Sequence, residues 1–541
     1  MMESHLSSWL HGAALAALLT TGLALPGCAD PVPSSAADDL TSVTAVEREL
    51  TFAGYVYVHP DATDDDILWS VHQQTRSAFG AFLTQNIAVA TRELANVDPS
   101  TFVREPVTVI DAAGDPAYET LRVRYQYVDR AVVPKPMAHR SALRLGLLHG
   151  DYPAQAERVL TECSLNTAEE REMFDDVWYV FNPGLDSCKT AINAEQRAID
   201  QQRETLDDGA SQIVGAELER LYVPMTVSLR AVAGTSKRLY PEYDRLWSGG
   251  VDPNALVITL LNGMIDHPKP GQSHHPVDDP GYWEMLGEMD VILADHPDFR
   301  VVATDPPTDL STFQIDGELI TGLSFQRFID FELYQWGFPE WLTTAQQTEL
   351  RRLVAARLSH RWITLEKPVS VSIDGGVATP RTVRLQLYFG VDEEPEPYHR
   401  GIAQSDVFLY NGHSFIGEGP LDPVHFTVNE FPASYQIFFI DSCLSFNYYN
   451  SDYFAFKADG SQSLDVVSNG LESFSDGAGA GQGRFVVGLL SSETPSWVEL
   501  LQLASTTGSD YAWGKDALRV VDGELDNEFK PWETAVQVQA P

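Results

Sequence analysis

A histidine and a cysteine that follow two apolar runs are the residues of this chain best suited to chemistry. The first run, 406–411, is followed by Gly412 and His413, and the second, 435–442, is followed by Cys443. Continuous apolar, aromatic and β-branched runs are typical of strands that are buried on both faces of an α/β sheet. Residues just beyond the carboxyl ends of such strands line the ligand crevice. The pattern therefore predicts an imidazole and a thiol at the same edge of one sheet.

These two side chains together could perform nucleophilic catalysis. A thiol becomes a nucleophile when an imidazole accepts its proton and backbone amides wait for the developing oxyanion. The alternative is that His413 merely follows a strand and that Cys443 is a buried, inert thiol. The spacing alone does not decide between these interpretations.

The order of these residues resembles that of the caspase-like cysteine peptidases, and in particular the gingipain branch. The resemblance rests on Asn411-Gly412-His413 after one strand and Asp441-Ser442-Cys443 after the next. It implies that His413 is the general base and then acid, and that Cys443 is the acyl-forming nucleophile. The local sequence predicts a helix over 464–474, a glycine-rich loop over 477–483 and a strand over 485–490, and this order is also similar to that of the gingipains after the nucleophile.

The same resemblance suggests roles for the neighbours of the two residues. The amide of Cys443 would be one oxyanion donor, and the second would lie beside His413, where Gly412 and Ser414 flank the ring. Asp441 would line a pocket for an arginine or lysine side chain before the scissile bond. The alternative is that Asp441 caps the helix that follows Cys443.

The amino terminus predicts export. Residues 10–25 form an apolar run of the length of a signal peptide's hydrophobic region, which is too short for a comfortable membrane span. The run ends in Leu25-Pro26-Gly27-Cys28, which resembles a bacterial lipobox, so we expect Cys28 to be lipidated after removal of residues 1–27. The alternative is an ordinary secretory signal. The predicted location is the bacterial cell envelope by a lipid anchor, or the exterior by secretion.

The four cysteines support this compartment. If Cys28 carries lipid, Cys163 and Cys188 form a natural pair within one region of the chain, and an oxidising compartment favours their disulfide. Cys443 is then the odd thiol. An unpaired cysteine in an exported protein is either buried and inert or reactive and useful.

Composition excludes several classes of partner. The net charge of −41 argues against nucleic acid and against electrostatic attraction to anionic lipid, so the membrane contact is limited to the lipid anchor. The expected partner is a protein or peptide substrate. No zinc-protease motif, nucleophile elbow or phosphate loop is present, so no cofactor and no metal are predicted, and no motif supports calcium. We interpret the adjacent His274 and His275 as solvated loop residues.

The alternation of elements predicts the domain organisation. Residues 28–49 read as a flexible tether, and 50–223 as an α+β amino-terminal domain in which 141–148 is expected to be helical. Residues 225–541, with a core over 254–505, are predicted to form a caspase-like α/β domain whose mainly parallel sheet is flanked by helices.

Three functions follow from these observations. The first is a cysteine endopeptidase with a His413/Cys443 dyad on the extracytoplasmic face, cleaving after arginine or lysine. The second is a catalytically inactive surface lipoprotein that binds a partner through the same fold. The third is a structural envelope lipoprotein that acts through its amino-terminal domain.

Overall fold

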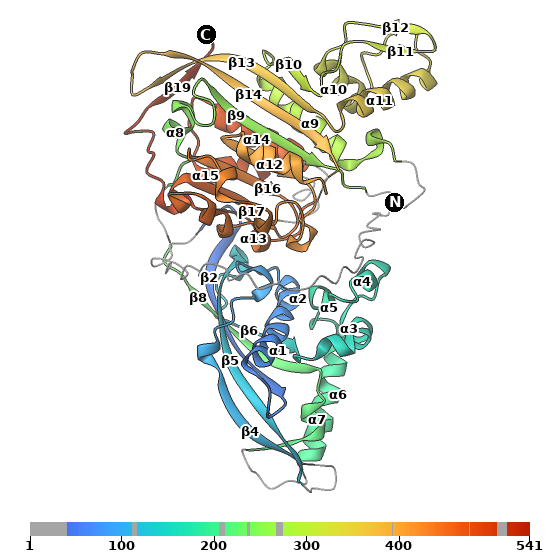
Figure 1. The fold of residues 1–541 in the computed structure, drawn as a ribbon, viewed down its shortest axis with the longest axis vertical. Helices are drawn as coiled ribbons and strands as arrows, with labels where there is room; N and C mark the ends of the chain where they lie inside the picture. The colour runs from blue at the N-terminus through green and yellow to red at the C-terminus, as the bar shows by residue number, and fades with distance from the viewer. Residues whose placement is uncertain are drawn as a thin grey trace, which may run out of the picture.

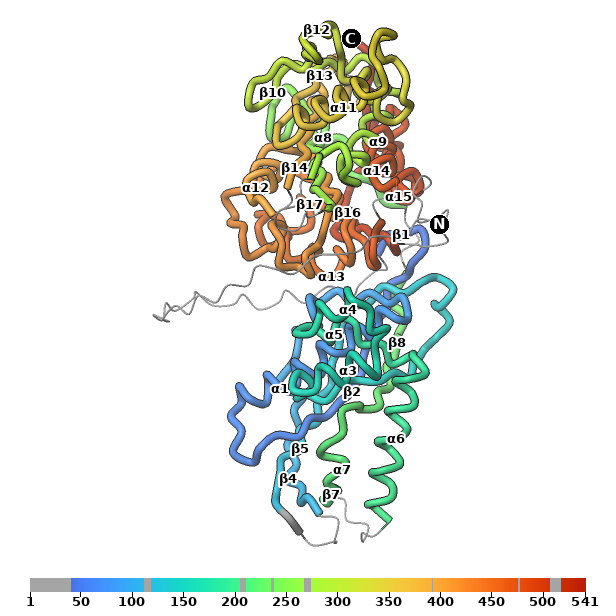
Figure 2. The backbone as a smooth tube through the Cα atoms, turned by 90° about the vertical axis from the view of Figure 1, so that its right-hand side faces the viewer, coloured from blue at the N-terminus to red at the C-terminus, as the bar shows by residue number. Residues whose placement is uncertain are grey.

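The computed structural model describes residues 40–110, 116–204, 211–234, 238–266, 274–391, 393–474, 477–505 and 517–541. Figure 1 shows two units stacked along the long axis of the molecule, each built of one sheet with helices against it. The side view in Figure 2 shows the same separation, with α13 of the carboxyl-terminal unit facing the amino-terminal unit. Cys28 lies outside the described residues, so its lipidation stays a prediction.

The amino-terminal unit contains a largely antiparallel sheet with strand order β6-β8-β2-β5-β4-β7, in which β3 also pairs with β5. Its central strand β2 alternates between buried and more exposed residues along much of its length, as expected for a sheet with one packed face. The strands are β2 (Ala45–Val58), β3 (Ala88–Val89), β4 (Val103–Ile110), β5 (Pro116–Pro134), β6 (Ala142–Leu148), β7 (Gln212–Val214) and β8 (Tyr222–Ala231). The helices are α1 (Asp64–Arg76), α2 (Ala78–Leu83), α3 (Ala156–Cys163), α4 (Ala168–Glu172), α5 (Val177–Val180), α6 (Asp186–Arg203) and α7 (Gly215–Leu218).

The carboxyl-terminal unit contains a ten-stranded mixed sheet with order β1-β18-β17-β16-β15-β9-β14-β13-β10, in which β19 also pairs with β13. The strands are β1 (Thr41–Ser42), β9 (Ala255–Gly263), β10 (Arg300–Asp305), β13 (Trp362–Ile373), β14 (Thr379–Gly390), β15 (Val407–Asn411), β16 (Gln436–Asp441), β17 (Leu464–Asn469), β18 (Arg519–Asp522) and β19 (Val536–Gln539); β11 (Phe313–Ile315) and β12 (Glu318–Ile320) form a separate hairpin. The helices are α8 (Tyr243–Ser248), α9 (Pro280–Asp295), α10 (Phe325–Leu333), α11 (Thr344–Leu358), α12 (Pro395–Ala403), α13 (Ser445–Tyr448), α14 (Ala478–Leu490) and α15 (Trp497–Ser505).

The middle of this sheet is parallel and is buried on both faces. Strands β14, β9, β15, β16 and β17 run parallel to their neighbours, whereas the outer pairings are antiparallel. Alternate residues of β15 and β16 enter two different cores: Phe408 and Phe438 pack towards α12 and the amino-terminal unit, while Leu409 and Phe439 pack towards α9, α14 and α15. The expectation of buried α/β strands at these positions is confirmed.

Four local predictions are wrong. Residues 142–148 form strand β6, because they pair along their length with β8. Residues 464–469 form strand β17 rather than a helix, and 478–490 form a single helix, α14, rather than a loop followed by a strand. A Cβ atom at Gly479 would lie 2.0 Å from the Glu284 carbonyl oxygen of α9, so glycine there permits the close helix packing that a loop interpretation overlooks.

The boundaries of the units also differ from the predicted ones. Residues 41–42 pair with β18, and β2 begins at Ala45, so the second half of the predicted tether is ordered. Strand β8 continues to Ala231 within the amino-terminal sheet, which moves the boundary beyond residue 225. The predicted disulfide between Cys163 and Cys188 is confirmed. In the part of the chain that the structure describes, no helix has the length and apolar character that crossing a bilayer requires.

Candidate functional site

The two sheet strands place His413 and Cys443 at equivalent positions. Parallel pairing aligns Asn411 of β15 with Asp441 of β16, and each of the two reactive residues stands two positions beyond that rung. Adjacent strands lie about 4.8 Å apart. The imidazole and the thiol therefore both emerge at the carboxyl edge of the sheet from neighbouring strands.

Hydrogen bonds hold the half-buried His413 and define its basic nitrogen. The Tyr410 hydroxyl donates to the His413 carbonyl oxygen at 2.9 Å, and the imidazole Nε2 lies 3.0 Å from the carbonyl oxygen of Ile265. A carbonyl oxygen only accepts, so Nε2 carries a proton and Nδ1 is the basic nitrogen of the neutral ring. A ring in this tautomer can act as a general base through Nδ1.

Cys443 is a protonated thiol in this arrangement. It is half-buried, and its Sγ donates to the carbonyl oxygen of Ser473 at 3.5 Å. Burial, together with the nearby carboxylate of Glu472, raises the pKa of Cys443 to about 11. Because the thiolate is the nucleophilic form, the thiol of Cys443 is a weak nucleophile in this arrangement.

The backbone after each residue departs from ordinary geometry. Leu444, directly after Cys443, is a buried residue with φ 55°, and Phe415 and Ile416, shortly after His413, each have φ 52°. Left-handed conformations of such residues cost of order 1–3 kcal/mol each and cluster at functional sites. Such residues also occur elsewhere in the described chain, as at Leu94 and His360, so the strain is consistent with a functional site but does not by itself locate one.

The predicted oxyanion residues lie beside this edge. Gly412 is a glycine for steric reasons, because a Cβ atom there would lie 2.3 Å from the Tyr410 hydroxyl. Its amide nitrogen lies 3.5 Å from the carbonyl oxygen of Asp441. Ser414 is buried, and its carbonyl oxygen accepts a hydrogen bond from the Tyr449 hydroxyl.

Asp441 has neither of the two roles weighed for it. Its side chain is 1% exposed; one oxygen accepts from Arg519 Nη2 at 2.7 Å, and the other accepts from Asn469 Nδ2 at 2.6 Å. Sheet register aligns Asn262, Asn411 and Asp441 in one row, and Asn469 with Arg519 beyond them. Asp441 thus belongs to a buried polar row beneath the site, where its charge is neutralised by Arg519.

The amino-terminal unit packs against the segment that follows Cys443. Asn447 Nδ2 donates to the carbonyl oxygens of Val89 and Thr91 at 3.0 and 2.8 Å, and its Oδ1 accepts from the amide of Glu93 at 3.3 Å. An ion pair of 2.9 Å between Arg92 and Asp422 joins the same two units.

This packing extends to the thiol of Cys443. Burial, Glu472 and Cys443 together raise the pKa of Tyr179, a residue of α5, so its hydroxyl lies within electrostatic range of the thiol. The bulky residues after Cys443 therefore serve as the docking surface for the amino-terminal unit, which covers this side of the site.

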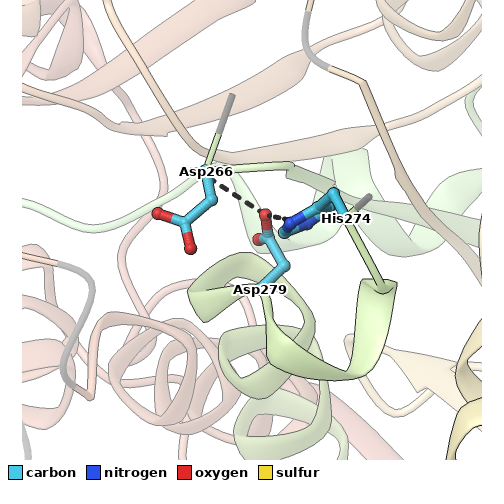
Figure 3. Close-up of side chains that lie close together, drawn as sticks. All are labelled: Asp266, His274 and Asp279. Atoms are coloured by element: carbon cyan, nitrogen blue, oxygen red, sulfur yellow. Dashed lines mark hydrogen bonds and ion pairs between the residues drawn. The ribbon is translucent and has the colours of Figure 1, made fainter. Parts of the chain in front are cut away.

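A second cluster, which the sequence analysis missed, lies on the other side of His413. Figure 3 shows Asp266, His274 and Asp279 close together, and the ligand atoms of the three all lie within 4.8 Å of one another. His274 is half-buried, with Nε2 3.1 Å from Asp279 Oδ2, so the expectation that it is a solvated loop residue is wrong. His275 is exposed, as expected. Asp279 before Pro280 is a recognisable helix N-cap, but nothing local links it to His274.

No protein-family model matches this chain, and neither a curated protein nor a solved structure matches it significantly.

Proposed function

We propose that this chain is an extracytoplasmic cysteine endopeptidase in which His413 and Cys443 form the catalytic dyad. The observation that supports it is their equivalent placement, two residues beyond one rung of neighbouring parallel strands. Four strands of the parallel region lie in the order β14-β9-β15-β16. If these four are numbered 1 to 4 as they occur in the chain, their order in the sheet is 2-1-3-4. His413 follows the third of them and Cys443 follows the fourth. This resembles the caspase-like arrangement. The disulfide between Cys163 and Cys188 fits an oxidising compartment.

The proposed reaction uses the tautomer that the Ile265 carbonyl selects. His413 Nδ1 accepts the proton of Cys443 Sγ, and the thiolate attacks the scissile carbonyl carbon to give a tetrahedral oxyanion. The amide of Cys443 donates to this oxyanion. The imidazolium then protonates the leaving amine, and the acyl-thioester is hydrolysed by a water that gives its proton to His413.

Glu472 takes the place of Asp441 as the candidate for recognising a basic substrate side chain. It is exposed and lies close enough to Cys443 to raise the pKa of the thiol, whereas Asp441 is buried against Arg519. An exposed carboxylate beside the nucleophile would pair with an arginine or lysine before the scissile bond. We propose that cleavage after basic residues depends on Glu472.

The resting thiol requires activation. To form the thiolate, Cys443 Sγ must leave the carbonyl oxygen of Ser473 and donate its proton to His413 instead. The substrate must also reach the site on the side that the amino-terminal unit covers. We propose that displacement of the amino-terminal unit opens the site.

The test is hydrolysis of peptides by the full chain under reducing conditions that spare the disulfide, before and after limited proteolysis. Replacing Cys443 by alanine or His413 by alanine should abolish hydrolysis, whereas His425→Ala, at an exposed histidine of the same segment, should leave it unchanged. Glu472→Gln should reduce cleavage after arginine more than cleavage after alanine. Activity that survives Cys443→Ala would refute the dyad.

The second candidate function is a non-catalytic binding protein with the same architecture. The raised pKa of Cys443 and its hydrogen bond to Ser473 favour it. A chain that stays inactive after removal of the amino-terminal unit, yet remains folded, would support this alternative.

A further inference from the structure

The cluster of Asp266, His274 and Asp279 has the chemistry of a metal site. Asp279 is fully buried and caps α9, and backbone amides hold both of its oxygens: Ile265 and Gly281 donate to Oδ1 at 3.0 and 2.7 Å, and Asp266 donates to Oδ2 at 3.0 Å. A carboxylate offers about four lone-pair positions. Backbone amides therefore use three of these positions, and the fourth, on Oδ2, lies within hydrogen-bond distance of His274 Nε2, a contact that a bound ion would replace.

The distance between the two inner groups fits two ligands of one ion. His274 Nε2 lies 3.1 Å from Asp279 Oδ2. Tetrahedral ligands at metal distances of about 2.0–2.2 Å lie roughly 3.3–3.6 Å apart, so a shift of a few tenths of an ångström would place both groups on one ion. Asp266 completes the set from the open side; it is exposed, so its carboxylate can rotate to close the remaining distance. In Figure 3 its carboxylate lies beside that of Asp279.

The fold provides an independent reason to expect a ligand at this place. Strand β9 has parallel neighbours on both sides, β14 and β15. The chain passes from β9 through α9 on one face of the sheet and reaches β15 through α12 on the opposite face. A place where the connections of neighbouring parallel strands lie on opposite faces of the sheet is a topological switch point. Open α/β sheets bind their ligands in the crevice at the carboxyl ends of the strands at such a point. Asp266 follows β9, and Asp279 begins α9.

The chemical types of the three ligands, one imidazole and two carboxylates, indicate which kind of metal ion the cluster would bind. Imidazole suits zinc and other transition ions, whereas calcium and magnesium prefer oxygen ligands alone. The positive end of α9 opposes a bound cation, but two carboxylates offset it. Three protein ligands leave a coordination position open.

We propose that Asp266, His274 and Asp279 bind one divalent transition-metal ion of the zinc class. The ion joins the end of β9 to the start of α9. It also braces Ile265, whose carbonyl oxygen holds the His413 ring.

The test is calorimetric titration of the full chain, stripped with a chelator, with ZnCl₂ and separately with CaCl₂. Cys443→Ala is used as the parent so that the thiol cannot bind zinc. One equivalent of zinc should bind, and Asp266→Asn and His274→Gln should each weaken it about tenfold or more. His275→Gln is the matched control and should bind like the parent. His274→Gln keeps a donor for Asp279, and circular dichroism checks that each variant is folded.

Cobalt gives a readout that does not depend on affinity alone. Co²⁺ should produce visible d–d bands in the Cys443→Ala chain, and His274→Gln should change them. Absence of one-to-one zinc binding, equal binding by His274→Gln, or calcium binding as tight as zinc would overturn the proposal. None of these measurements uses peptide hydrolysis, so their failure is distinct from failure of the proposed peptidase.

Discussion

Replacing Asp441 by asparagine removes one charge from the buried pair beneath the site while it keeps the size of the side chain. Arg519 Nη2 donates to Asp441 at 2.7 Å, and both side chains are 10% exposed or less. Removing one partner of a buried ion pair leaves an uncompensated charge and costs about 3–5 kcal/mol. We therefore expect Asp441→Asn to lower the free energy of unfolding by about 3 kcal/mol or more.

A second substitution separates lost charge from lost packing. Arg519→Gln alone should destabilise the chain for the same reason, because it leaves the buried carboxylate of Asp441 without a counter-charge. Together, Asp441→Asn and Arg519→Gln replace two charges by two hydrogen-bonding amides. The free energy of unfolding should therefore decrease less in the double variant than the sum of the decreases in the two single variants. The coupling energy should reach about 1–3 kcal/mol.

The assay is urea unfolding followed by tryptophan fluorescence. The control is Asp186→Asn, which removes an exposed ion pair with Lys189 and should change stability by no more than about 0.5 kcal/mol. If Asp441→Asn lies within 1 kcal/mol of the parent, or removes the preference for basic substrates without loss of stability, Asp441 is a pocket residue and the reasoning fails.

Three further predictions concern other groups. Burial raises the pKa of Glu288 from 4.5 to about 8, so the folded chain keeps a proton that the unfolded chain has lost. The free energy of unfolding should therefore decrease as pH rises from about 4.5 to 8. Unfolding curves measured across this range should show a smaller decrease for Glu288→Gln, and an unchanged decrease for Asp295→Asn, which is exposed on the same helix. The disulfide closes a 25-residue separation, so replacing Cys163 and Cys188 by alanine should cost about 3.5 kcal/mol by loop entropy; an unchanged melting temperature would contradict this. With its pKa raised to about 11, Cys443 should react slowly with iodoacetamide at pH 7 and about tenfold faster per pH unit; fast, pH-independent labelling would show an activated thiol instead.

The sequence predicts best where burial is uniform. Residues 407–410 and 437–440 are continuous apolar or aromatic runs, and a strand buried on both faces needs no knowledge of its partners to be recognised. Strand 464–469 contains Asp465, Ser468 and Asn469, all buried, and its local sequence favours a helix. Asp465 Oδ2 accepts from Tyr435 and Asn527, and Asn469 Oδ1 accepts from Arg519; no local pattern reveals these distant partners.

By itself, the sequence determined that His413 and Cys443 follow buried strands and that Cys163 and Cys188 can pair, because hydrophobic runs and cysteine counts are local properties. Only the tertiary structure decided which strands are neighbours, and thus that His413 and Cys443 stand two positions beyond the same rung. It also buried Asp441 against Arg519, 78 residues away, and brought His274 to Asp279 beside the carbonyl that holds His413. These outcomes depend on strand order and long-range pairing, which are set by the free energy of the whole packed chain rather than by any one segment.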